Sequence, residues 1–419
     1  MSQTGLAPRK AAVDMLNAVL EEGKLLSEVP TAKLSVPEAA RAQRLAVETL
    51  RWMGRADRLL GRYLRKMPPV PVMNILRLGV YEICQEGEAS HGVVNSAVEL
   101  VHKGKKTGHL KGLVNATLRK VATDGPGLWP TLAVPELPKW LRKPLIADYT
   151  KPVIKDMEQV FMNGAPLDLT PKDGNAEALA VRLGGEVLSS GSVRLQSPGQ
   201  VSKLPGFVEG DWWVQDAAAA MPVKLLAPKE GESVLDMCAA PGGKTMQMAA
   251  AGAKVTALDQ SERRMQRVAE NLKRTGLSAN LVVGDALEHI GVGYDAILLD
   301  APCTATGTIR RHPDLPYAKD GSDFPYLFEL QERMIDHALS LLNPGGRLVF
   351  CTCSLLPDEG EIQIEDAMKR HGDLQILAPD APWIEETWKS GEGGLRLRPD
   401  YWGEIGGMDG FYMAHLSRS

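Results

Sequence analysis

Apolar side chains recur at spacings of three and four residues between residues 8 and 122, which is the spacing of one face of an α-helix. Few β-branched runs interrupt this pattern, and Pro and Gly separate the segments that carry it. Those segments are residues 11–20, 38–64, 72–84, 91–103 and 110–122. We therefore expect an N-terminal helical bundle, followed by a linker in the Pro- and Gly-rich stretch 124–138.

Residues 139–215 show a mixed pattern of helical spacing and strand-like composition. The predicted elements are helices at 139–149, 152–162 and 175–184, and a strand in "PLDLTPK" at 166–172. A small α/β connecting module fits this stretch. A further helix within residues 212–228 is expected to open a third region.

From residue 233 onward, short apolar runs alternate with helix-like segments, which is the pattern of βαβ units. Predicted strands cover residues 233–239, 254–259, 280–286, 294–302 and 345–353, and predicted helices cover 244–252, 261–276 and 327–342. The fold class is thus multidomain α and α/β, with a mostly parallel, doubly wound sheet in the last region. Ligands of such sheets bind beyond the carboxyl ends of the strands. The polar residues at those ends are Asp236, Asp259, Asp285, Asp300 and Cys353.

The composition of the 419-residue chain, 44% hydrophobic and 24% charged, is typical of a globular protein. Residues 1–10 lack the apolar core of a signal peptide, and no apolar run is long enough to span a bilayer. We therefore expect a cytoplasmic protein without membrane contact, by default a monomer. Five cysteines are an odd number in a reducing compartment, which disfavours a disulfide framework. The absence of a CxxC pair or a nearby His cluster disfavours a metal site.

The net charge of −4 hides an asymmetry along the chain. Residues 1–140 contain 20 Lys and Arg against 13 Asp and Glu, whereas the remainder is acidic. A basic module can meet phosphate, so the helical region is a candidate for nucleic-acid binding. An ordinary solvated helix face is the competing explanation for any single basic run.

The segment "LDMCAAPGGKT" (235–245) has the pattern of a strand, a Gly-rich turn and a helix, which can bring a ligand close to backbone N–H groups. A Walker A loop requires Gly where Cys238 stands, and a dinucleotide fingerprint requires three glycines, so neither fits. Asp259 ends the next strand, where it can accept bonds from a ribose. Asp285 ends the third strand, where it can meet an adenine amino group. Acids around a glycine turn suit S-adenosylmethionine, a cation without phosphate, although each Asp alone could be a helix cap or turn residue.

Two thiols are expected to meet at the same edge of the sheet. Cys303 follows the fourth strand in "DAPCTATG", and Cys353 follows the fifth in "VFCTCS". Carbon 5 of a pyrimidine becomes nucleophilic only after a thiolate adds to carbon 6; a group at N3 must then stabilise the adduct, and the C5 proton must leave before the thiol is expelled. One carboxyl group and one or two thiols meet these needs. The chemistry alone leaves the two cysteines nearly even as nucleophile.

Four motifs resemble the Nol/Nop/Sun family of RNA cytosine-C5 methyltransferases, and within it the bacterial RsmB-like enzymes of small-subunit rRNA. The motifs are "DMCAAPGGKT", "DAPCTATGTIRRHPD", "CTCSLLPDEGE" and "GMDGFYMA". "GVVNSAVEL" and "LKGLVNATLRKV" resemble the RNA-binding factor NusB. The resemblance covers nearly the whole chain. It implies a NusB-like RNA-binding domain at 1–125, a pre-catalytic module at 139–215 and a Rossmann-like methyltransferase domain at 216–419.

The resemblance also implies roles for individual residues. The cofactor S-adenosylmethionine is expected to contact Cys238, Ala239, Ala240, Pro241, Gly242, Gly243, Lys244, Asp259, Arg264, Asp285 and Asp300. Cys353 is the implied nucleophile, Cys303 the implied helper in product release, and Asp300 a further catalytic residue. Lys244 is expected to orient the active-site loops. Cys351 is expected to pack in the sheet, and Cys84 in the core of the bundle.

The implied substrate is an unpaired or flipped cytosine in 16S rRNA, because a thiol cannot reach a base inside a helix. Arg310, Arg311 and His312 could neutralise its phosphates, with structural Arg–carboxylate pairing as the alternative. Thr304-Ala305-Thr306-Gly307 departs from the Ser-Gly-Thr-Gly of many relatives but stays small. "PLDLTPK" lacks the Arg-x-Asn that many relatives carry there. A tRNA cytosine-C5 methyltransferase and a non-catalytic RNA-binding assembly factor are the alternative functions.

Overall fold

The protein is described by a computed structural model, which covers residues 5–31, 34–104, 106–196, 199–291 and 293–418. The chain forms two compact units. The first contains Met1–Asn163 and Ile309–Gly321, and the second contains Gly164–Thr308 and Ser322–Ser419. Residues 1–4, part of the segment judged not to be a signal peptide, lie outside the described residues.

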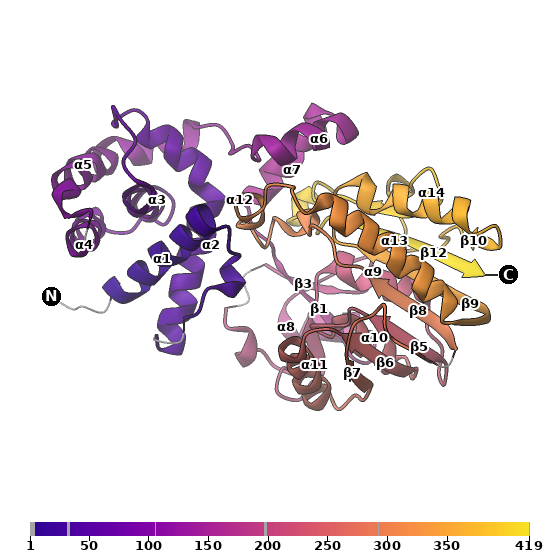
Figure 1. Cartoon of the computed structure of the whole chain (residues 1–419). Coiled ribbons are helices and arrows are strands. Elements are labelled where there is room, and N and C mark those ends of the chain that lie inside the picture. Colours follow the sequence, from indigo (N-terminus) through magenta and orange to yellow (C-terminus); the bar gives the residue numbers. More distant parts are fainter. Residues whose placement is uncertain (1–4, 32–33, 105, 197–198, 292, 419) are drawn as a thin grey trace. The chain divides into compact units, whose positions relative to one another are not determined.

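The first unit is built from helices, as the spacing of apolar residues predicts (Figure 1). Its helices are α1 (Leu6–Glu22), α2 (Val36–Leu60), α3 (Val70–Cys84), α4 (Ser90–Lys103), α5 (Lys111–Leu128), α6 (Lys139–Tyr149), α7 (Lys151–Met162) and the short α12 (Leu315–Ala318), with one-turn helices η2 (Leu26–Glu28), η3 (Gly108–Leu110) and η4 (Trp129–Thr131). A capping box joins Ser35 and Glu38 at the start of α2, where it satisfies backbone N–H groups that the helix cannot. The apolar faces of α1 to α5 share one core, which includes Leu16, Leu50 and Leu76.

The linker predicted from residue 124 is wrong at its start, because α5 continues through Gly125 and Pro126 to Leu128. Gly125 is buried, and a Cβ built on it would lie 2.7 Å from the Cys84 sulfur, so glycine lets the helices approach closely here. Trp129 is buried directly after the helix and donates to Gln85 Oε1 at 2.7 Å. Gly125, which the sequence suggests is part of a turn, therefore allows α5 to pack closely against α3.

The stretch predicted as one connecting module is divided between the two units. Helices α6 and α7 belong to the first unit, where the Arg51 guanidinium donates to the carbonyl of Phe161 at 2.6 Å and to that of Arg310 at 2.8 Å. The segment 309–321 also belongs there, and its Asp314 accepts a bond from the Leu26 N–H at 2.8 Å. The structure divides the chain into two compact units, whereas the sequence predicts three domains. The three-domain division stays a prediction.

The small sheet of the second unit contains β1 (Leu167–Pro171), β2 (Glu186–Val187), β3 (Val193–Leu195) and β4 (Trp212–Val214), in the order β2-β3-β1-β4 with antiparallel neighbours. Helix α8 (Ala176–Leu183) packs on it, and η5 (Val201–Lys203) follows β3. The strand and the helix predicted here are confirmed. Strands β2, β3 and β4 were not predicted.

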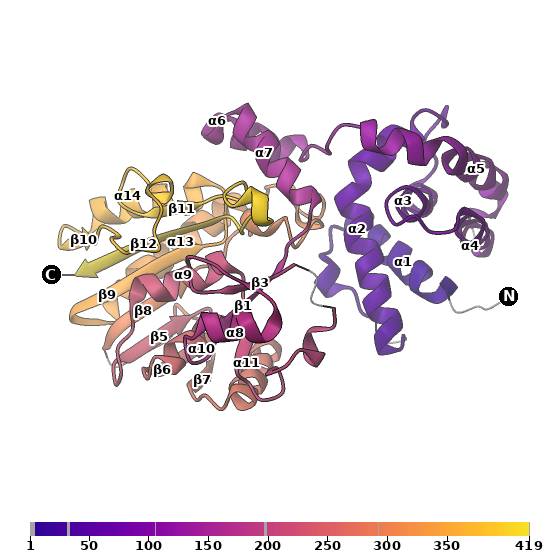
Figure 2. The same cartoon turned by 180° about the vertical axis from the view of Figure 1, so that it is seen from behind.

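The main sheet has the order β10-β12-β9-β8-β5-β6-β7, with β11 paired to β12 (Figures 1 and 2). Its parallel strands are β5 (Ser233–Met237), β6 (Lys254–Asp259), β7 (Asn280–Val283), β8 (Tyr294–Asp300) and β9 (Leu342–Thr352). The chain moves outward from β5 to β7 and returns to β8 and β9 on the other side, so the predicted doubly wound sheet is confirmed. An antiparallel extension that was not predicted contains β10 (Leu374–Ile376), β11 (Leu395–Leu397) and β12 (Phe411–Arg418).

Helices cover both faces of the main sheet (Figures 1 and 2). One core lies under α13 (Phe324–Ser340) and α14 (Glu361–Arg370), and another lies under α9 (Ala217–Leu226) and α10 (Gly243–Ala250). Helix α11 (Glu262–Thr275) packs beside α10. The remaining one-turn helices are η6 (Thr306–Thr308), η7 (Pro357–Glu359), η8 (Glu386–Trp388) and η9 (Gly403–Ile405). The carboxyl ends of β5, β6, β8 and β9 remain the edge at which ligands of such sheets bind.

Candidate functional site

The two predicted active-site thiols meet at the carboxyl edge of the main sheet. Strands β8 and β9 are parallel neighbours, with Asp300 opposite Cys351, so the loops that follow them leave the sheet side by side. The Cys303 and Cys353 sulfurs lie 3.5 Å apart, within hydrogen-bond distance. Neither side chain is sealed from solvent. The structure therefore brings together two thiols that stand 50 positions apart in the sequence.

The two thiols are not equivalent. A hydrogen bond to Cys353 and burial raise the pKa of Cys303 well above its ordinary value. Cys303 therefore keeps its proton, and its S–H group can donate to the neighbouring sulfur. This geometry places a hydrogen-bond donor next to the Cys353 sulfur.

Cys351 is a core residue at the end of β9 and is fully buried. Burial raises the pKa of its thiol well above the ordinary value, and its sulfur lies 3.7 Å from an Asp300 carboxylate oxygen. The prediction that it packs in the sheet is confirmed. Cys84 is half-buried against the helical core, and burial raises its pKa to about 12.

The loops that carry the thiols are tied together by backbone bonds. The N–H of Gly307 donates to the carbonyl of Cys353 at 2.9 Å, and the N–H of Gly410 donates to the carbonyl of Gly307 at 2.8 Å. Arg396 reaches the Ser354 carbonyl from β11 at 2.5 Å. The three sequence motifs that contain Cys303, Cys353 and Gly410 thus form one connected structure.

The Gly-rich turn after β5 has the backbone that its sequence predicts. Gly242 has φ +99°, a conformation that favours glycine, and a Cβ on it would lie 3.1 Å from Val268. Helix α10 begins at the next residue, so its free N–H groups point out of this turn. The side chains of Ala239 and Ala240 are buried, while Pro241 is exposed. Burial, together with nearby carboxylates, raises the pKa of the Cys238 thiol far above its ordinary value, so this thiol stays neutral.

Asp259 organises this turn from the end of β6. One carboxylate oxygen accepts the Ala240 N–H at 3.1 Å, and the other accepts the Ser261 N–H at 2.9 Å. Arg264 donates to the Ala240 carbonyl and lies 3.6 Å from the same carboxylate. Each Asp259 oxygen keeps a second lone pair, so the carboxylate can still accept a ligand hydroxyl.

Asp300 is paired with Lys244 between the Gly-rich turn and the thiols. The Lys244 ammonium lies 2.7 Å from an Asp300 oxygen and 5.1 Å from the centre of the Phe411 ring. Burial lowers the pKa of this ammonium, but the neighbouring carboxylates outweigh it and raise the pKa overall. Lys244 is therefore charged and tied to Asp300, and its role in orienting the loops stays a prediction.

Asp285 lies at the exposed end of β7, where its carboxylate accepts the Leu287 N–H at 2.9 Å. This bond is typical of a turn residue, which is the alternative to a cofactor-binding role for Asp285. The second carboxylate oxygen can still accept a bond from a ligand. Asp236 is fully buried at the end of β5. It accepts the Thr245 hydroxyl at 2.5 Å, while its other oxygen accepts no hydrogen bond within the part of the chain that the structure describes. Burial raises the pKa of Asp236 to about 7.

Two contacts of the site were not predicted. Glu359 and Gln331 are fully buried, and both bond the loop around Cys303. Glu359 stands in an acidic run, and Gln331 is a lone polar residue on the buried face of a helix, which is the available sequence signal. One prediction fails: the Arg310 side chain is fully buried in the first unit and cannot meet a phosphate in this structure. Arg311 and His312 are exposed.

The residues around the Gly-rich turn fit S-adenosylmethionine. They offer carboxylates and backbone amides, and the one lysine of the turn, Lys244, is neutralised by Asp300. A phosphate would be repelled by this set, whereas a cationic sulfonium and a ribose are favoured. Cys238 to Lys244, Asp259, Arg264, Asp285 and Asp300 would hold the group. Among the described residues, no cluster of three or more His, Cys, Asp or Glu could bind a metal ion.

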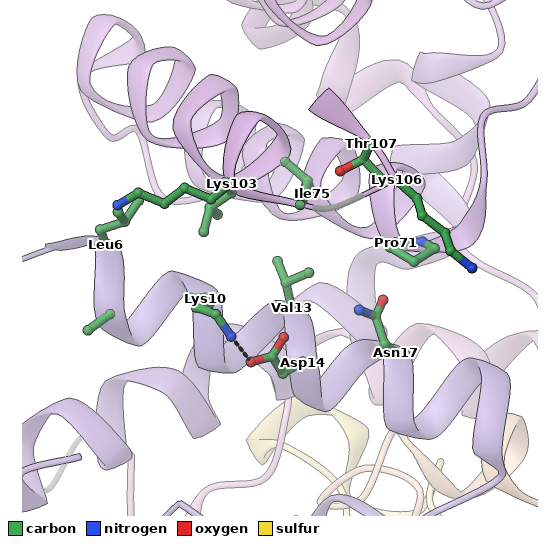
Figure 3. A pocket seen from close by; sticks show the side chains of 13 residues that line it. Leu6, Lys10, Val13, Asp14, Asn17, Pro71, Ile75, Lys103, Lys106 and Thr107 are labelled. Carbon is green, nitrogen blue, oxygen red and sulfur yellow. Dashed lines mark hydrogen bonds and ion pairs between the residues drawn. The ribbon is translucent and has the colours of Figure 1, made fainter. Parts of the chain in front are cut away.

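A separate cavity of about 520 Å³ lies in the first unit between α1, α3 and the end of α4 (Figure 3). Val13 and Ile75 form its apolar wall, Lys103 and Lys106 stand at its rim, and Lys10 pairs with Asp14 at 2.6 Å. It contains none of the predicted site residues. In the described ranges no helix is long and apolar enough to cross a membrane.

Comparisons with known proteins agree with this organisation. The family model described as 16S rRNA methyltransferase RsmB/F matches residues 223–417, and the NusB family model matches residues 6–123. The chain is 34% identical to ribosomal RNA small subunit methyltransferase B of Erwinia tasmaniensis, over 97% of this chain and 98% of that protein. It is also 34% identical to the protein of the same name from Vibrio cholerae, over 98% and 97% of the two chains.

Two solved structures support the fold. The crystal structure of PH0851 has a TM-score of 0.75 and 22% identity, over 98% of this chain and 99% of that one. A methyltransferase homolog protein from Pyrococcus horikoshii has a TM-score of 0.56 and 28% identity, over 67% of this chain and 95% of that one.

Proposed function

Because this chain belongs to the ribosomal RNA small subunit methyltransferase B family, we propose that it transfers a methyl group from S-adenosylmethionine to C5 of a cytosine in 16S rRNA. The proposed route is a covalent bond between the Cys353 sulfur and C6 of the ring. One observation carries the choice of chemistry. The Cys303 and Cys353 sulfurs lie 3.5 Å apart, at the carboxyl ends of two neighbouring strands whose sheet also carries the Gly-rich turn.

The first step is attack by the Cys353 thiolate on C6, which forms the S–C6 bond and moves an electron pair toward C5. The Cys303 sulfur lies 3.5 Å from the attacking sulfur, close enough for its S–H group to donate to it. Asp300, held by Lys244, is assigned to the N4 amino group of the ring, which donates to the carboxylate, and this bond aligns the base. S-adenosylmethionine, when bound, supplies the methyl group that C5 accepts.

The last step regenerates the enzyme. The C5 proton passes to solvent, its bonding electrons restore the C5–C6 double bond, and the S–C6 bond breaks to release the Cys353 thiolate. We assign Cys303 to assist this release, because its sulfur is the neighbour of the leaving sulfur. The target base must be unpaired or turned out of a helix for both sulfurs to reach it.

The basic excess of residues 1–140 supports RNA contact by the first unit. The 16S rRNA in the description of the family model, and the small-subunit ribosomal RNA in the names of the relatives, favour rRNA over tRNA as the substrate. Labelled methyl transfer from the cofactor to total RNA, located by bisulfite sequencing, separates three outcomes. Label in 16S rRNA supports the proposal, label confined to tRNA replaces the substrate, and no label favours a non-catalytic assembly factor.

Cys353→Ala tests the assignment of the nucleophile. We expect it to abolish methyl transfer while the dissociation constant for S-adenosylmethionine stays within about twofold, since only the attacking sulfur is removed. Titration calorimetry measures the binding and labelled transfer measures the rate. Residual turnover of even a tenth would overturn the assignment. Cys303→Ala is the matched variant and should trap a protein–RNA adduct visible on denaturing gels.

A further inference from the structure

Glu359 connects the surroundings of both thiols. Its carboxylate is fully buried and accepts bonds from two residues of the Cys303 side of the site. The N–H of Thr304 donates to it at 3.0 Å, the Thr304 hydroxyl at 2.5 Å, and the amide of Gln331 at 3.0 Å. Gln331 also donates to the carbonyl of Pro302 at 2.8 Å. The residues before and after Cys303 are therefore both held by this pair.

The backbone of Glu359 holds the other thiol. Its carbonyl accepts the hydroxyl of Thr352 at 2.8 Å, and Thr352 directly precedes Cys353. Glu359 lies only six positions after Cys353, at the end of η7, whereas Thr304 is 55 positions away in the chain. Glu359 thus binds the residue next to each cysteine. Its side chain binds Thr304, which follows Cys303, and its backbone carbonyl binds Thr352, which precedes Cys353.

We propose that Glu359 is a positioning residue that fixes the Cys303 sulfur next to the Cys353 sulfur. This inference rests on the proposed function for the roles of the two thiols. A carboxylate accepts every donor aimed at it, because both of its oxygens are acceptors. Glutamine at this position has one acceptor oxygen, so the Thr304 N–H, the Thr304 hydroxyl and the Gln331 amide can no longer all donate to it. At least one of these bonds is lost or reversed, which loosens the Cys303 loop and the fixed separation of the two sulfurs.

The separation of the sulfurs can be measured without RNA. Phenylarsine oxide condenses with two thiols that lie close together, forming two As–S bonds and releasing one water, and no oxidant is involved. We expect Glu359→Gln to weaken this binding at least tenfold relative to the wild-type full chain. Cys303→Ala gives the level of phenylarsine oxide binding by a chain that lacks the pair of neighbouring thiols. Asp358→Asn, an exposed neighbour on the same turn, is the matched control and should bind as the wild type does.

Activity gives a second, independent readout. In Glu359→Gln we expect kcat to fall about tenfold with the KM for RNA changed less than threefold, and the covalent adduct to accumulate, because release is slowed more than attack. A change in arsenical affinity below twofold would overturn the proposal, whatever the activity. The arsenical result stands even if the wild type proves to methylate another RNA, so the two hypotheses fail separately.

A second variant covers the case in which Glu359→Gln does not fold. Gln331→Leu keeps the size of the side chain and removes the amide that joins Glu359 to Pro302. We expect it to weaken arsenical binding about threefold while S-adenosylmethionine affinity stays within twofold. Unchanged arsenical binding in this variant would equally contradict the proposal.

Discussion

Three cysteine sulfurs lie near the carboxyl ends of β8 and β9, and their surroundings decide their chemistry. Cys351 is enclosed by the sheet core, while Cys353 stands just past the end of the strand and faces Cys303. A separation of two positions therefore distinguishes a core residue from one that faces a second thiol at the edge of the sheet. The spacing in the sequence could not make this distinction, because it depends on where the strand ends.

Asp236 predicts a pH dependence of stability at the residue scale. Burial raises its pKa to about 7 in the folded protein, while the unfolded chain keeps the ordinary value, so folding favours the protonated form. The resulting stability is present at low pH and is lost as pH rises through about 7. Asp236→Asn removes this titration. The difference in free energy of unfolding between the two proteins should change by roughly 2 to 3 kcal/mol between pH 5 and pH 8.

Urea unfolding of both proteins at several pH values measures this difference. Other titrating groups cancel because they are common to the two chains. If the free energies of unfolding of the wild type and of Asp236→Asn changed in parallel with pH, Asp236 would not titrate in this range.

The meeting of the thiols could be predicted, since parallel strands end at one edge of a sheet. The position of the Asp259 carboxylate at the Gly-rich turn follows from the same rule. Glu359 and Gln331 could not be predicted, because their bonds join residues 28 to 55 positions apart without any periodic pattern. Arg310 was predicted wrongly, because its basic side chain is buried in the fold.

At the scale of elements, the loops after β8 and β9 and before β12 are held at backbone contact distance. Gly307 makes this approach possible, because a Cβ built on it would lie 1.9 Å from the Gly410 carbonyl oxygen. Backbone atoms cannot swing away as a side chain can, so any larger residue must push the loops apart.

We therefore predict that Gly307→Ala lowers the free energy of unfolding by about 1–3 kcal/mol, as overpacking does. Methyl transfer should fall at least tenfold, because the loops that carry both thiols move. Denaturant unfolding and labelled transfer check the two effects. Gly372→Ala is the control, since a Cβ there meets no atom within 4 Å. Wild-type activity in Gly307→Ala would show that the loops tolerate a wider gap.

The parallel strands and the helices of the bundle follow from their sequence patterns. The antiparallel strands were missed for two reasons. Strands β2, β3, β4, β10 and β11 are two or three residues long and show no periodicity. Strand β12 is buried on both faces for most of its length, so apolar and polar residues do not alternate along it.

At the scale of the whole molecule, the first unit is discontinuous. Residues 309–321 directly follow the Cys303 loop in the chain, yet their contacts are with the N-terminal helices. Asp314 accepts the Leu26 N–H, and the Trp140 indole donates to the Pro316 carbonyl at 3.0 Å. Local patterns in the sequence predict successive modules and cannot show that a later segment returns to an earlier one.

This arrangement predicts the behaviour of a truncated protein that begins at residue 164. Its segment 309–321 lacks the partners of Asp314 and Pro316, so it should become a site of rapid proteolysis. Limited digestion followed by mass spectrometry should show at least tenfold faster cleavage there than in the full chain. The Gly-rich turn at 391–394 serves as the reference and should be cut equally in both. Equal protection of residues 309–321 would show that the second unit alone keeps them ordered.

The same return of the chain sets an order of events during synthesis on the ribosome. Residues 1–163 are translated about 150 residues before the segment that completes their unit. At about 5–20 residues per second this is a wait of roughly 7–30 seconds. The core that α1 to α5 share can form before that segment exists, whereas the bonds to Asp314 and Pro316 close only after most of the second unit has been made.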